Sequence, residues 1–340
     1  MHAITRHPKD RTPWQAELGQ AYAGLDDLLD ALGLTAEACG VSAEAAAGFP
    51  LRVPRGFVAR MRHGDSRDPL LRQVLPIEAE NAVLPGFGSD PVGDLASVRT
   101  PGLLQKYSGR ALLVTTGACA VHCRYCFRRA FPYSGHSTTP GVLTAALDAI
   151  AADDSLQEII LSGGDPLALG NGRLAEIIHA LGRIPHILRI RVHTRLPVVL
   201  PERIDDGLLE LLRDAGKPVV TVIHANHANE IDAGVVAALD GLRGVSAALL
   251  NQSVLLRGVN DSVDALAALS QRLFSAGVLP YYLHQLDRVA GAAHFLVPDH
   301  TAVALHAAMA ARLPGYLVPR LVREIAGAAA KTPLEHFGTT

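Results

Sequence analysis

The sequence predicts an α/β fold, a partial TIM-type barrel of six strand–helix units that follows a helical N-terminal extension. Three observations lead to this prediction. The chain has 340 residues, of which 49% are hydrophobic and 19% charged, so it can supply a large buried core. From Arg110 onward, short runs of consecutive apolar residues alternate with segments of helical periodicity. Strands that are apolar on consecutive residues and separated by helices pair in parallel, with both faces covered.

The first hundred residues are predicted to be helical and irregular. Residues 26–32 show apolar spacings of three and four, and residues 43–47 form a second helix-prone run. Prolines from Pro50 to Pro101 then interrupt a stretch with little periodicity, which is expected to wrap the main domain as an arm. We expect three parts: an N-terminal helical segment with its arm (1–100), a barrel core (101–316) and a C-terminal segment (317–340).

Six strands and six helices are expected from the apolar pattern of the core. The strands are predicted at residues 111–116, 158–162, 187–193, 219–224, 249–256 and 280–285. The helices are predicted at residues 139–152, 173–181, 204–215, 231–242, 262–276 and 300–312. A doubly wound open sheet is the alternative, because strand order cannot be read from a sequence.

Polar motifs follow the predicted strands at the point where each strand ends. Cys119–Cys126 follows the first strand and Gly163–Asp165 the second, while His193–Arg195, His224 and Asp287 close the third, fourth and sixth. In both candidate architectures, ligands bind at the carboxyl ends of the strands. The sequence therefore predicts that one mouth of the barrel collects the chemistry.

The cysteine pattern predicts an iron–sulfur cluster. Cys119, Cys123 and Cys126 have Cys-x3-Cys-x2-Cys spacing, and the fourth cysteine, Cys39, lies far upstream. A [4Fe-4S] cluster needs four thiolates for complete coordination, so three leave one iron free. That iron could bind the amine and carboxylate of S-adenosylmethionine (SAM). A zinc site completed by His122 or by a distant histidine is the alternative, but no second paired motif with suitable spacing is visible.

Composition and charge argue against several classes of partner. The net charge of -2 gives no reason to expect nucleic acid or an anionic membrane as a partner. No apolar run reaches about 18 residues, and the polar start MHAITRHPKDRTPW has no apolar signal-peptide core. The expectation is a cytoplasmic protein with reduced cysteines.

The cysteine loop, together with Ser162-Gly163-Gly164-Asp165-Pro166, resembles the signature of the radical SAM superfamily. Taken further, the chain resembles the lysine 2,3-aminomutase family, whose enzymes combine a [4Fe-4S] cluster and SAM with pyridoxal 5′-phosphate (PLP). The segments that carry this resemblance are Lys106–Arg110, Cys119–Arg129, Thr194–Pro201, Asn251–Asp261, Tyr281–Asp287 and 314–331.

The resemblance implies roles for individual residues in four groups. The cluster ligands would be Cys119, Cys123 and Cys126. PLP would be bound covalently by Lys331, its phosphate held by Arg110 with Lys106 and Tyr107. The SAM site would be lined by Gly163, Gly164, Asp165, His224 and Gln252. Arg128 would bind the carboxylate of the substrate, and Asp287 and Glu324 would bind its distal ammonium.

Two departures indicate a branch of the family. Glu324 stands where the family has an aspartate, and the chain ends at Thr340 without the cysteine-bearing extension of the larger enzymes. Ser262 takes the position of a further zinc cysteine in those enzymes, so no zinc is expected. The short length and the Cys-Arg-Tyr-Cys-Phe-Arg-Arg motif resemble the EpmB branch, which serves the β-lysylation of elongation factor P.

This branch implies that free L-α-lysine is converted to (R)-β-lysine. The partners implied are a flavodoxin or ferredoxin as reductant, and a lysyl-tRNA-synthetase-like ligase that attaches the product to elongation factor P. Three alternatives stay open. The chain could act on another amino acid, it could be a radical enzyme without PLP, or it could be a non-catalytic iron–sulfur electron-transfer protein.

Overall fold

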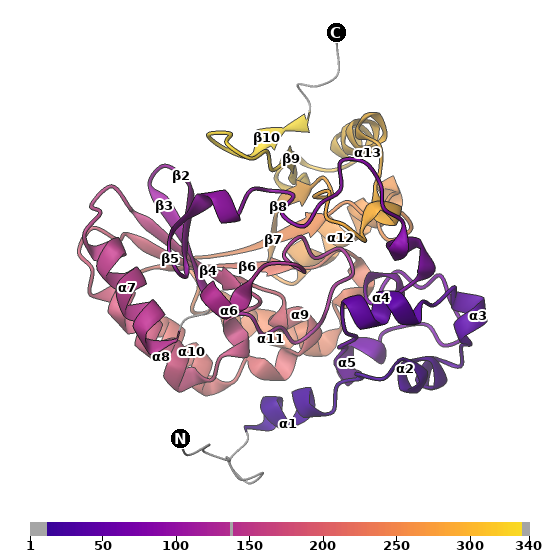
Figure 1. Ribbon diagram of the computed structural model, residues 1–340, viewed down its shortest axis with the longest axis horizontal. Coiled ribbons are helices and arrows are strands. Elements are labelled where there is room, and N and C mark those ends of the chain that lie inside the picture. Colours follow the sequence, from indigo (N-terminus) through magenta and orange to yellow (C-terminus); the bar gives the residue numbers. More distant parts are fainter. Residues whose placement is uncertain (1–11, 137–138, 335–340) are drawn as a thin grey trace.

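The computed structural model describes residues 12–136 and 139–334, and its centre is a ten-stranded sheet (Figure 1). Most of the polar N-terminal stretch, which the sequence analysis judged not to be a signal peptide, lies outside these residues. The strands are β1 (Val98–Thr100), β2 (Leu103–Tyr107), β3 (Arg110–Thr116), β4 (Glu158–Gly163), β5 (Arg189–Thr194), β6 (Val219–His224), β7 (Ala248–Val254), β8 (Leu279–His284), β9 (Arg320–Arg323) and β10 (Thr332–Pro333).

The strands lie side by side in the order in which they occur in the chain. Neighbours from β3 to β9 pair in parallel, while β1 and β2 precede them and β10 follows them in antiparallel pairing. A doubly wound sheet would reverse its strand order part-way, and this sheet does not. The prediction of a partial barrel is therefore confirmed, and the doubly wound alternative is wrong.

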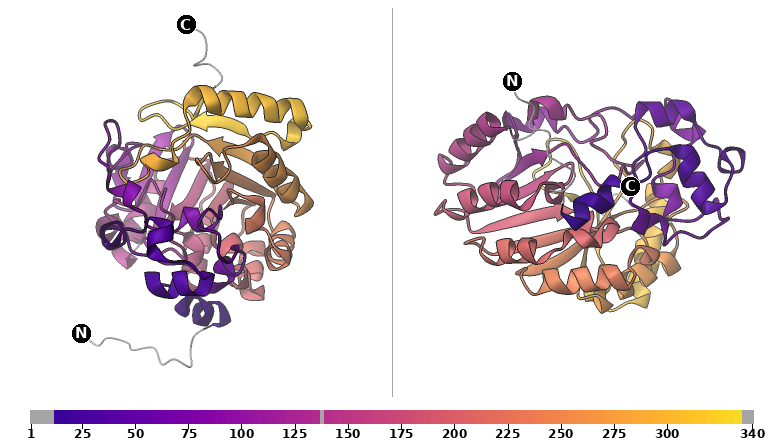
Figure 2. Two further views of the ribbon diagram at one scale, coloured as in Figure 1. Left: turned by 90° about the vertical axis from the view of Figure 1, so that its right-hand side faces the viewer. Right: turned by 90° about the horizontal axis from the view of Figure 1, so that it is seen from below.

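Helices cover the outside of this curved sheet (Figures 1 and 2). The main ones are α7 (Pro140–Ala151), α8 (Asn171–Gly182), α10 (Asp206–Arg213), α11 (Ala233–Arg243), α12 (Val263–Ser275) and α13 (Asp299–Arg312). The apolar sides of these helices pack against the strand side chains that point out of the barrel, and together they form the hydrophobic core. Ile177 of α8, for example, belongs to the same buried cluster as Leu161 of β4.

Side-chain caps fix where several of these helices begin. The hydroxyl of Thr139 and the carboxylates of Asp205 and Asp232 accept hydrogen bonds from the first turns of α7, α10 and α11. Ser262 does the same for α12, where its hydroxyl accepts from the amide of Ala265 at 3.2 Å. Ser262 therefore caps a helix at the position that the resemblance aligns with a zinc-binding cysteine of the larger enzymes.

The N-terminal segment packs as a group of short helices against the barrel (Figure 1, indigo). These helices are α1 (Pro13–Gly19), α2 (Leu25–Leu32), α3 (Ala36–Cys39), α4 (Ala43–Gly48) and α5 (Arg55–Val58). Leu28 of α2 and Phe57 of α5 are buried in the same core cluster as Val198 of the short helix α9 (Leu196–Val199). The segment therefore shares one core with the barrel.

Four of the ten strands were not expected from the sequence. β1 and β2 come immediately before the first predicted strand, and β9 and β10 lie within the predicted C-terminal segment. They have only two to five residues each, which is too few to show the apolar periodicity of a strand in the sequence. β9 adds a seventh parallel strand to the predicted six.

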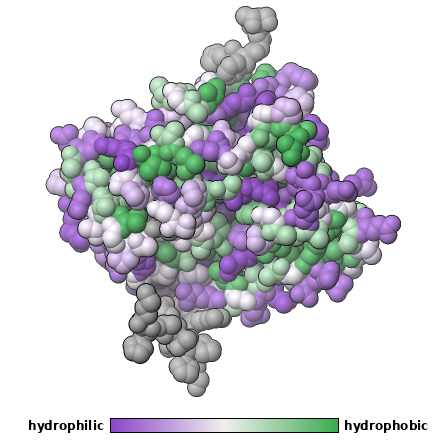
Figure 3. Space-filling view, viewed as in Figure 1, coloured by the Kyte–Doolittle hydropathy of each residue, from purple (hydrophilic) through white to green (hydrophobic). Residues whose placement is uncertain are grey.

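Within the described residues, no helix is both long and apolar enough to cross a membrane. On the face drawn in Figure 3, hydrophobic side chains form small patches separated by hydrophilic ones.

Candidate active site

A cavity of about 500 Å³ occupies the concave side of the sheet, at the carboxyl ends of the parallel strands. Ser162, His193 and Gln252 project into it from β4, β5 and β7, whereas their strand neighbours Leu161 and Val192 face the helices. Every residue that the sequence analysis assigned to the site lines this cavity: Lys106, Tyr107, Arg110, Cys119, Cys123, Cys126, Arg128, Gly163, Gly164, Asp165, His224, Gln252, Asp287, Glu324 and Lys331.

The three cysteines lie on the loop between β3 and α6 (Tyr133–His136). Burial raises the pKa of the Cys119 thiol, and the charges of Cys126 and Cys123 raise it further. Burial and the charge of Cys123 likewise raise the pKa of Cys126 to about 11. The three thiols are therefore mutual neighbours, and their proximity opposes ionisation unless positive charge is bound among them.

The structure gives no support to a zinc site completed by His122. His122 is engaged elsewhere, since its Nδ1 lies 2.8 Å from the carbonyl oxygen of Pro50. No three His, Cys, Asp or Glu side chains of the described chain converge closely enough to share one metal ion. A zinc ion needs such convergence, whereas each thiolate of a [4Fe-4S] cluster binds a different iron.

Gly163 and Gly164 allow the cysteine loop to lie directly against the end of β4. Gly163 has a φ of +121°, and a Cβ there would lie 2.5 Å from the carbonyl oxygen of Thr116. A Cβ on Gly164 would lie 2.4 Å from the carbonyl oxygen of Ala118. Besides lining the expected SAM site, these glycines thus approach the backbone of the loop that carries Cys119.

Asp165 braces two loops of the site. Its Oδ1 accepts hydrogen bonds from the amide of Leu167 at 3.0 Å and the hydroxyl of Thr194 at 2.8 Å. Its Oδ2 accepts from the amides of Arg195 at 2.6 Å and Leu196 at 3.2 Å. Burial raises the pKa of this carboxyl to about 6, against the effect of these donors. Asp165 therefore ties the end of β4 to the turn after β5.

A chain of alternating charges crosses the cavity. Lys331 Nζ lies 2.5 Å from Glu324 Oε2, and Glu324 Oε1 lies 3.0 Å from Lys106 Nζ. Lys106 also reaches Asp94 Oδ1 at 2.6 Å, and Asp94 Oδ2 accepts from Arg128 Nε at 2.6 Å. The two carboxylates thus connect three cations in one line.

The cations in this line determine the ionisation of its acids. Burial alone would raise the pKa of Glu324, but the charges of Lys331 and Lys106 outweigh it and lower the pKa to about 2. Asp94 is buried as well, and the charges of Arg128 and Lys106 hold its pKa below the usual value. Both carboxylates are therefore ionised at neutral pH.

Asp287 has the opposite behaviour. Burial and the nearby charge of Glu324 raise its pKa to about 7, although Lys331 and Lys106 act against this rise. Asp287 lines the cavity, and no hydrogen bond to its carboxylate is found within residues 12–136 and 139–334. It is thus an acid without a counter-ion next to an ionised one, an arrangement that a second cation would relieve.

The residues suited to a phosphate lie beside Lys331. The guanidinium of Arg110 lies 4.7 Å from the centre of the Tyr107 ring, and Arg110 forms no ion pair with the described residues. The Tyr107 hydroxyl is buried next to Glu324, and burial and the charge of Glu324 raise the pKa of Tyr107. These donors fit a phosphate group. Lys106, which was assigned to the same phosphate, is instead committed to Asp94, Glu324 and the carbonyl oxygen of Val92.

His224 and Gln252 are register partners on β6 and β7. His224 Nε2 lies 2.9 Å from the Tyr125 hydroxyl, and burial holds the pKa of His224 well below its usual value. Burial has the same effect on His193 and His284. The imidazoles that line the cavity are therefore neutral.

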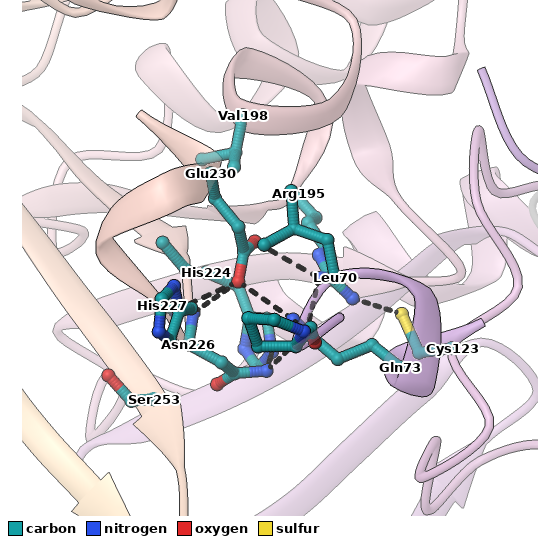
Figure 4. A network of polar contacts seen from close by, with 12 residues as sticks. Leu70, Gln73, Cys123, Arg195, Val198, His224, Asn226, His227, Glu230 and Ser253 are labelled. Atoms are coloured by element: carbon teal, nitrogen blue, oxygen red, sulfur yellow. Dashed lines mark hydrogen bonds and ion pairs between the residues drawn. The ribbon is translucent and has the colours of Figure 1, made fainter. Parts of the chain in front are cut away.

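Sequence reasoning missed two groups of residues in the site. Asp94 lies in the proline-interrupted arm, and no local pattern distinguishes it from a surface acid. Gln73 and Glu230 join Arg195 in a buried polar network beside Cys123 (Figure 4). Arg195 did carry a signal, because it directly follows a predicted strand whose end faces the site.

Comparison with known proteins identifies the family. A model of the radical SAM superfamily matches residues 113–248. L-lysine 2,3-aminomutase of Escherichia coli (strain K12) is 47% identical over 335 residues, which cover 98% of each chain. The chain belongs to the L-lysine 2,3-aminomutase family. The resemblance expected from the sequence is therefore confirmed.

Two further members of this family show how far the similarity extends. L-lysine 2,3-aminomutase of Haemophilus influenzae (strain ATCC 51907 / DSM 11121 / KW20 / Rd) is 44% identical and covers 98% of this chain and 99% of its own. L-lysine 2,3-aminomutase of Clostridium subterminale is 31% identical and covers 96% of this chain but 78% of its own. As a member of a family of radical SAM isomerases, the protein is an enzyme.

Proposed function

We propose that this enzyme converts L-α-lysine to (R)-β-lysine, using a [4Fe-4S] cluster, SAM and PLP, for the modification of elongation factor P. The observation that carries the proposal is the shared cavity. It brings together the cysteine loop, Lys331 and the acid pair Asp287 and Glu324, although they are up to about two hundred residues apart in the chain. A lysine aminomutase needs these three features within reach of one substrate.

The cluster ligands would be Cys119, Cys123 and Cys126, with Gly163, Gly164, Asp165, His224 and Gln252 around SAM. When bound, the cluster and SAM supply a carbon-centred radical that removes a hydrogen atom from the substrate. Neutral His224, beside Gln252, can offer a hydrogen bond without adding charge next to the sulfonium. The buried loop excludes water and other hydrogen donors from this part of the cavity.

PLP would be bound covalently by Lys331, and Arg110 and Tyr107 would hold its phosphate. When bound, PLP supplies a conjugated ring that stabilises unpaired electron density during migration of the amino group. The guanidinium of Arg110, which forms no ion pair with the described residues and lies over the Tyr107 ring, supports this assignment. For Lys106, the contacts with Asp94 and Glu324 favour an indirect role, in which it holds these acids in place.

The charges of the cavity match a substrate with a cation at its far end. Asp287 and Glu324 together would neutralise the distal ammonium of lysine, which a buried site accepts only with partners. Arg128 would face the substrate carboxylate, and Asp94 holds its Nε at 2.6 Å. An enzyme for glutamate would need a cation where Asp287 and Glu324 lie, so these acids favour lysine.

The link to elongation factor P rests on the resemblance of the short chain and its Cys-Arg-Tyr-Cys-Phe-Arg-Arg motif to the EpmB branch. In this proposal a flavodoxin or ferredoxin supplies the electron. A lysyl-tRNA-synthetase-like ligase then transfers (R)-β-lysine to elongation factor P.

Anaerobic reconstitution with iron, sulfide and PLP, followed by lysine, SAM and dithionite, tests the proposal. Chiral chromatography should detect (R)-β-lysine, and both Cys123→Ala and Lys331→Ala should abolish it. Cys39→Ala and Lys217→Ala are matched controls, since Cys39 is on α3 and Lys217 contacts only the carbonyl oxygen of Pro185 at 3.4 Å. Both controls should retain activity.

The other outcomes separate the alternatives. SAM cleavage without β-lysine would indicate an aminomutase for another amino acid, and Lys331→Ala with unchanged PLP absorbance would contradict the PLP assignment. An intact cluster that never cleaves SAM would instead favour an electron-transfer protein.

A further inference from the structure

Arg195 places a permanent positive charge directly on one of the three cysteines. Its Nη1 lies 2.6 Å from Cys123 Sγ (Figure 4). The same nitrogen lies 2.6 Å from the hydroxyl of Tyr125. A guanidinium stays protonated at any pH that a folded protein tolerates. The Tyr125 side chain also interacts with the Cys123 sulfur.

The guanidinium is fixed from its other side by two residues of distant segments. Arg195 Nη2 donates to Gln73 Oε1 at 2.8 Å and to Glu230 Oε2 at 3.1 Å. The other oxygen of Glu230 accepts from the amides of Asn226 at 2.8 Å and His227 at 3.0 Å. Glu230 is therefore held rigidly, and it orients Arg195 without moving itself.

The main chain of Arg195 is anchored as firmly as its side chain. Its amide donates to Asp165 at 2.6 Å, so the residue is tied to the end of β4 as well as to the arm and to the turn after β6. The whole side chain is only 7% exposed. A buried arginine with this many constraints cannot rotate away from the sulfur without breaking the network.

Hydrogen bonds and positive charge at the sulfurs are among the factors that determine the reduction potential of an iron–sulfur cluster. Reduction adds one negative charge to the cluster, and a nearby cation stabilises that charge more in the reduced state than in the oxidised state. The desolvated surroundings of Arg195 strengthen this effect, because little water screens it.

We propose that Arg195 raises the reduction potential of the cluster, and thereby eases the one-electron reduction that precedes SAM cleavage. It acts as a positioning and tuning residue, through a charge-assisted hydrogen bond to the Cys123 thiolate. Gln73 and Glu230 hold it in that position. The inference rests on the proposed function only in that the three cysteines bind a [4Fe-4S] cluster.

The test is the midpoint potential of the reconstituted cluster, measured by electron paramagnetic resonance at a series of poised potentials. Arg195→Gln removes the charge. Arg195→Lys keeps the charge, but a single ammonium cannot donate to Cys123 and to Gln73 and Glu230 with the planar geometry of the guanidinium. Both should shift the potential to more negative values, Arg195→Gln by more. Arg203→Lys is the matched control, because Arg203 is equally buried but donates to the carbonyl oxygens of Leu167 and Leu169.

The outcomes distinguish this inference from the function on which it rests. A wild-type protein that binds no [4Fe-4S] cluster would contradict the proposed function itself. A wild-type cluster whose potential is unchanged in Arg195→Gln and Arg195→Lys, each with full iron content, would overturn the inference alone. If Arg195→Gln does not retain iron, the comparison is made between Arg195→Lys and Arg203→Lys. A more negative potential in Arg195→Lys supports the inference, and equal potentials overturn it.

Discussion

Asp287 and Glu324 face the same end of the cavity, yet their pKa values are shifted in opposite directions. The ammonium groups of Lys331 and Lys106 touch Glu324 directly and keep it charged. Asp287 has no such contact, so burial and the charge of Glu324 dominate its ionisation. One acid is therefore permanently ionised, while the other changes its charge within the physiological range.

This difference predicts the pH dependence of lysine binding. Only ionised Asp287 attracts the distal ammonium, so kcat/KM for lysine should rise as the pH increases through the pKa of Asp287. This pKa is about 7 while the Lys331 ammonium is free, and it is higher when PLP engages Lys331, because that ammonium lowers it. Asp287→Asn should lower kcat/KM by roughly 100-fold and remove this rise. Glu324→Gln should move the rise to lower pH, because the charge that elevates the pKa of Asp287 is gone. An unchanged rise in Asp287→Asn would show that another group causes it.

At the scale of single elements, the parallel strands were predictable and the flanking ones were not. Five of the six strands from β3 to β8 carry consecutive apolar residues, because one face meets helices and the other meets a partly apolar cavity. The exception is β5, Arg189–Thr194, in which polar and apolar residues alternate. β9 consists of Arg320-Leu-Val-Arg323, which is too short to differ from a loop in sequence. Its place in the sheet comes from pairing with β8, a tertiary contact that no local pattern encodes.

The contact between β4 and the cysteine loop predicts a position where even one methyl group is not tolerated. Gly164→Ala should push against the backbone of Ala118, destabilise the fold by about 1–3 kcal/mol and reduce the iron bound per chain. Iron analysis and urea unfolding measure these effects. Gly172→Ala in α8 is the control, since a Cβ there meets nothing within 4 Å. Equal iron content in Gly164→Ala and the wild type would contradict the role assigned to this contact.

At the scale of the whole molecule, a buried ion cluster joins the N-terminal segment to the cysteine loop. Glu80 accepts from Arg124 Nη2 at 2.7 Å and from Arg129 Nη1 at 3.1 Å. Arg124 is fully buried and also donates to the carbonyl oxygens of Phe49 and Ala45. The helices of the N-terminal segment therefore help to hold the loop that carries the cysteines.

Removal of this charge should destabilise the whole protein. Glu80→Gln leaves the buried guanidinium of Arg124 and the partly buried one of Arg129 without their counter-ion, which should lower the free energy of unfolding by about 3–5 kcal/mol. Urea denaturation followed by circular dichroism measures the loss. Glu78→Gln provides the matched control, because Glu78 belongs to the same short helix but is exposed. Similar stabilities for the two variants would show that the pair contributes little.

The residues of the site were largely predictable, whereas their partners were not. Cysteine spacing and family resemblance identified the groups that would bind cofactors and substrate, and all of them line the cavity. Asp94, Gln73 and Glu230 were missed because they act through other side chains. Their importance depends on which segments meet in space. Lys106 illustrates the same limit, since its sequence context indicates a phosphate ligand but its ammonium lies between two acids.

The ion pair between Lys106 and Glu324 spans 218 residues of the chain. Closing a flexible loop of that length in one step costs about 5 kcal/mol of entropy, beyond a constant term. The strand order divides this closure into stages, because each new strand can pair with the one made just before it. The cysteine half can therefore form while the end of the chain is still being synthesised, and the substrate end of the cavity is completed last. The order of the strands therefore implies an order of assembly, in which the lysine-binding end of the cavity forms only after β9 and β10 have joined the sheet.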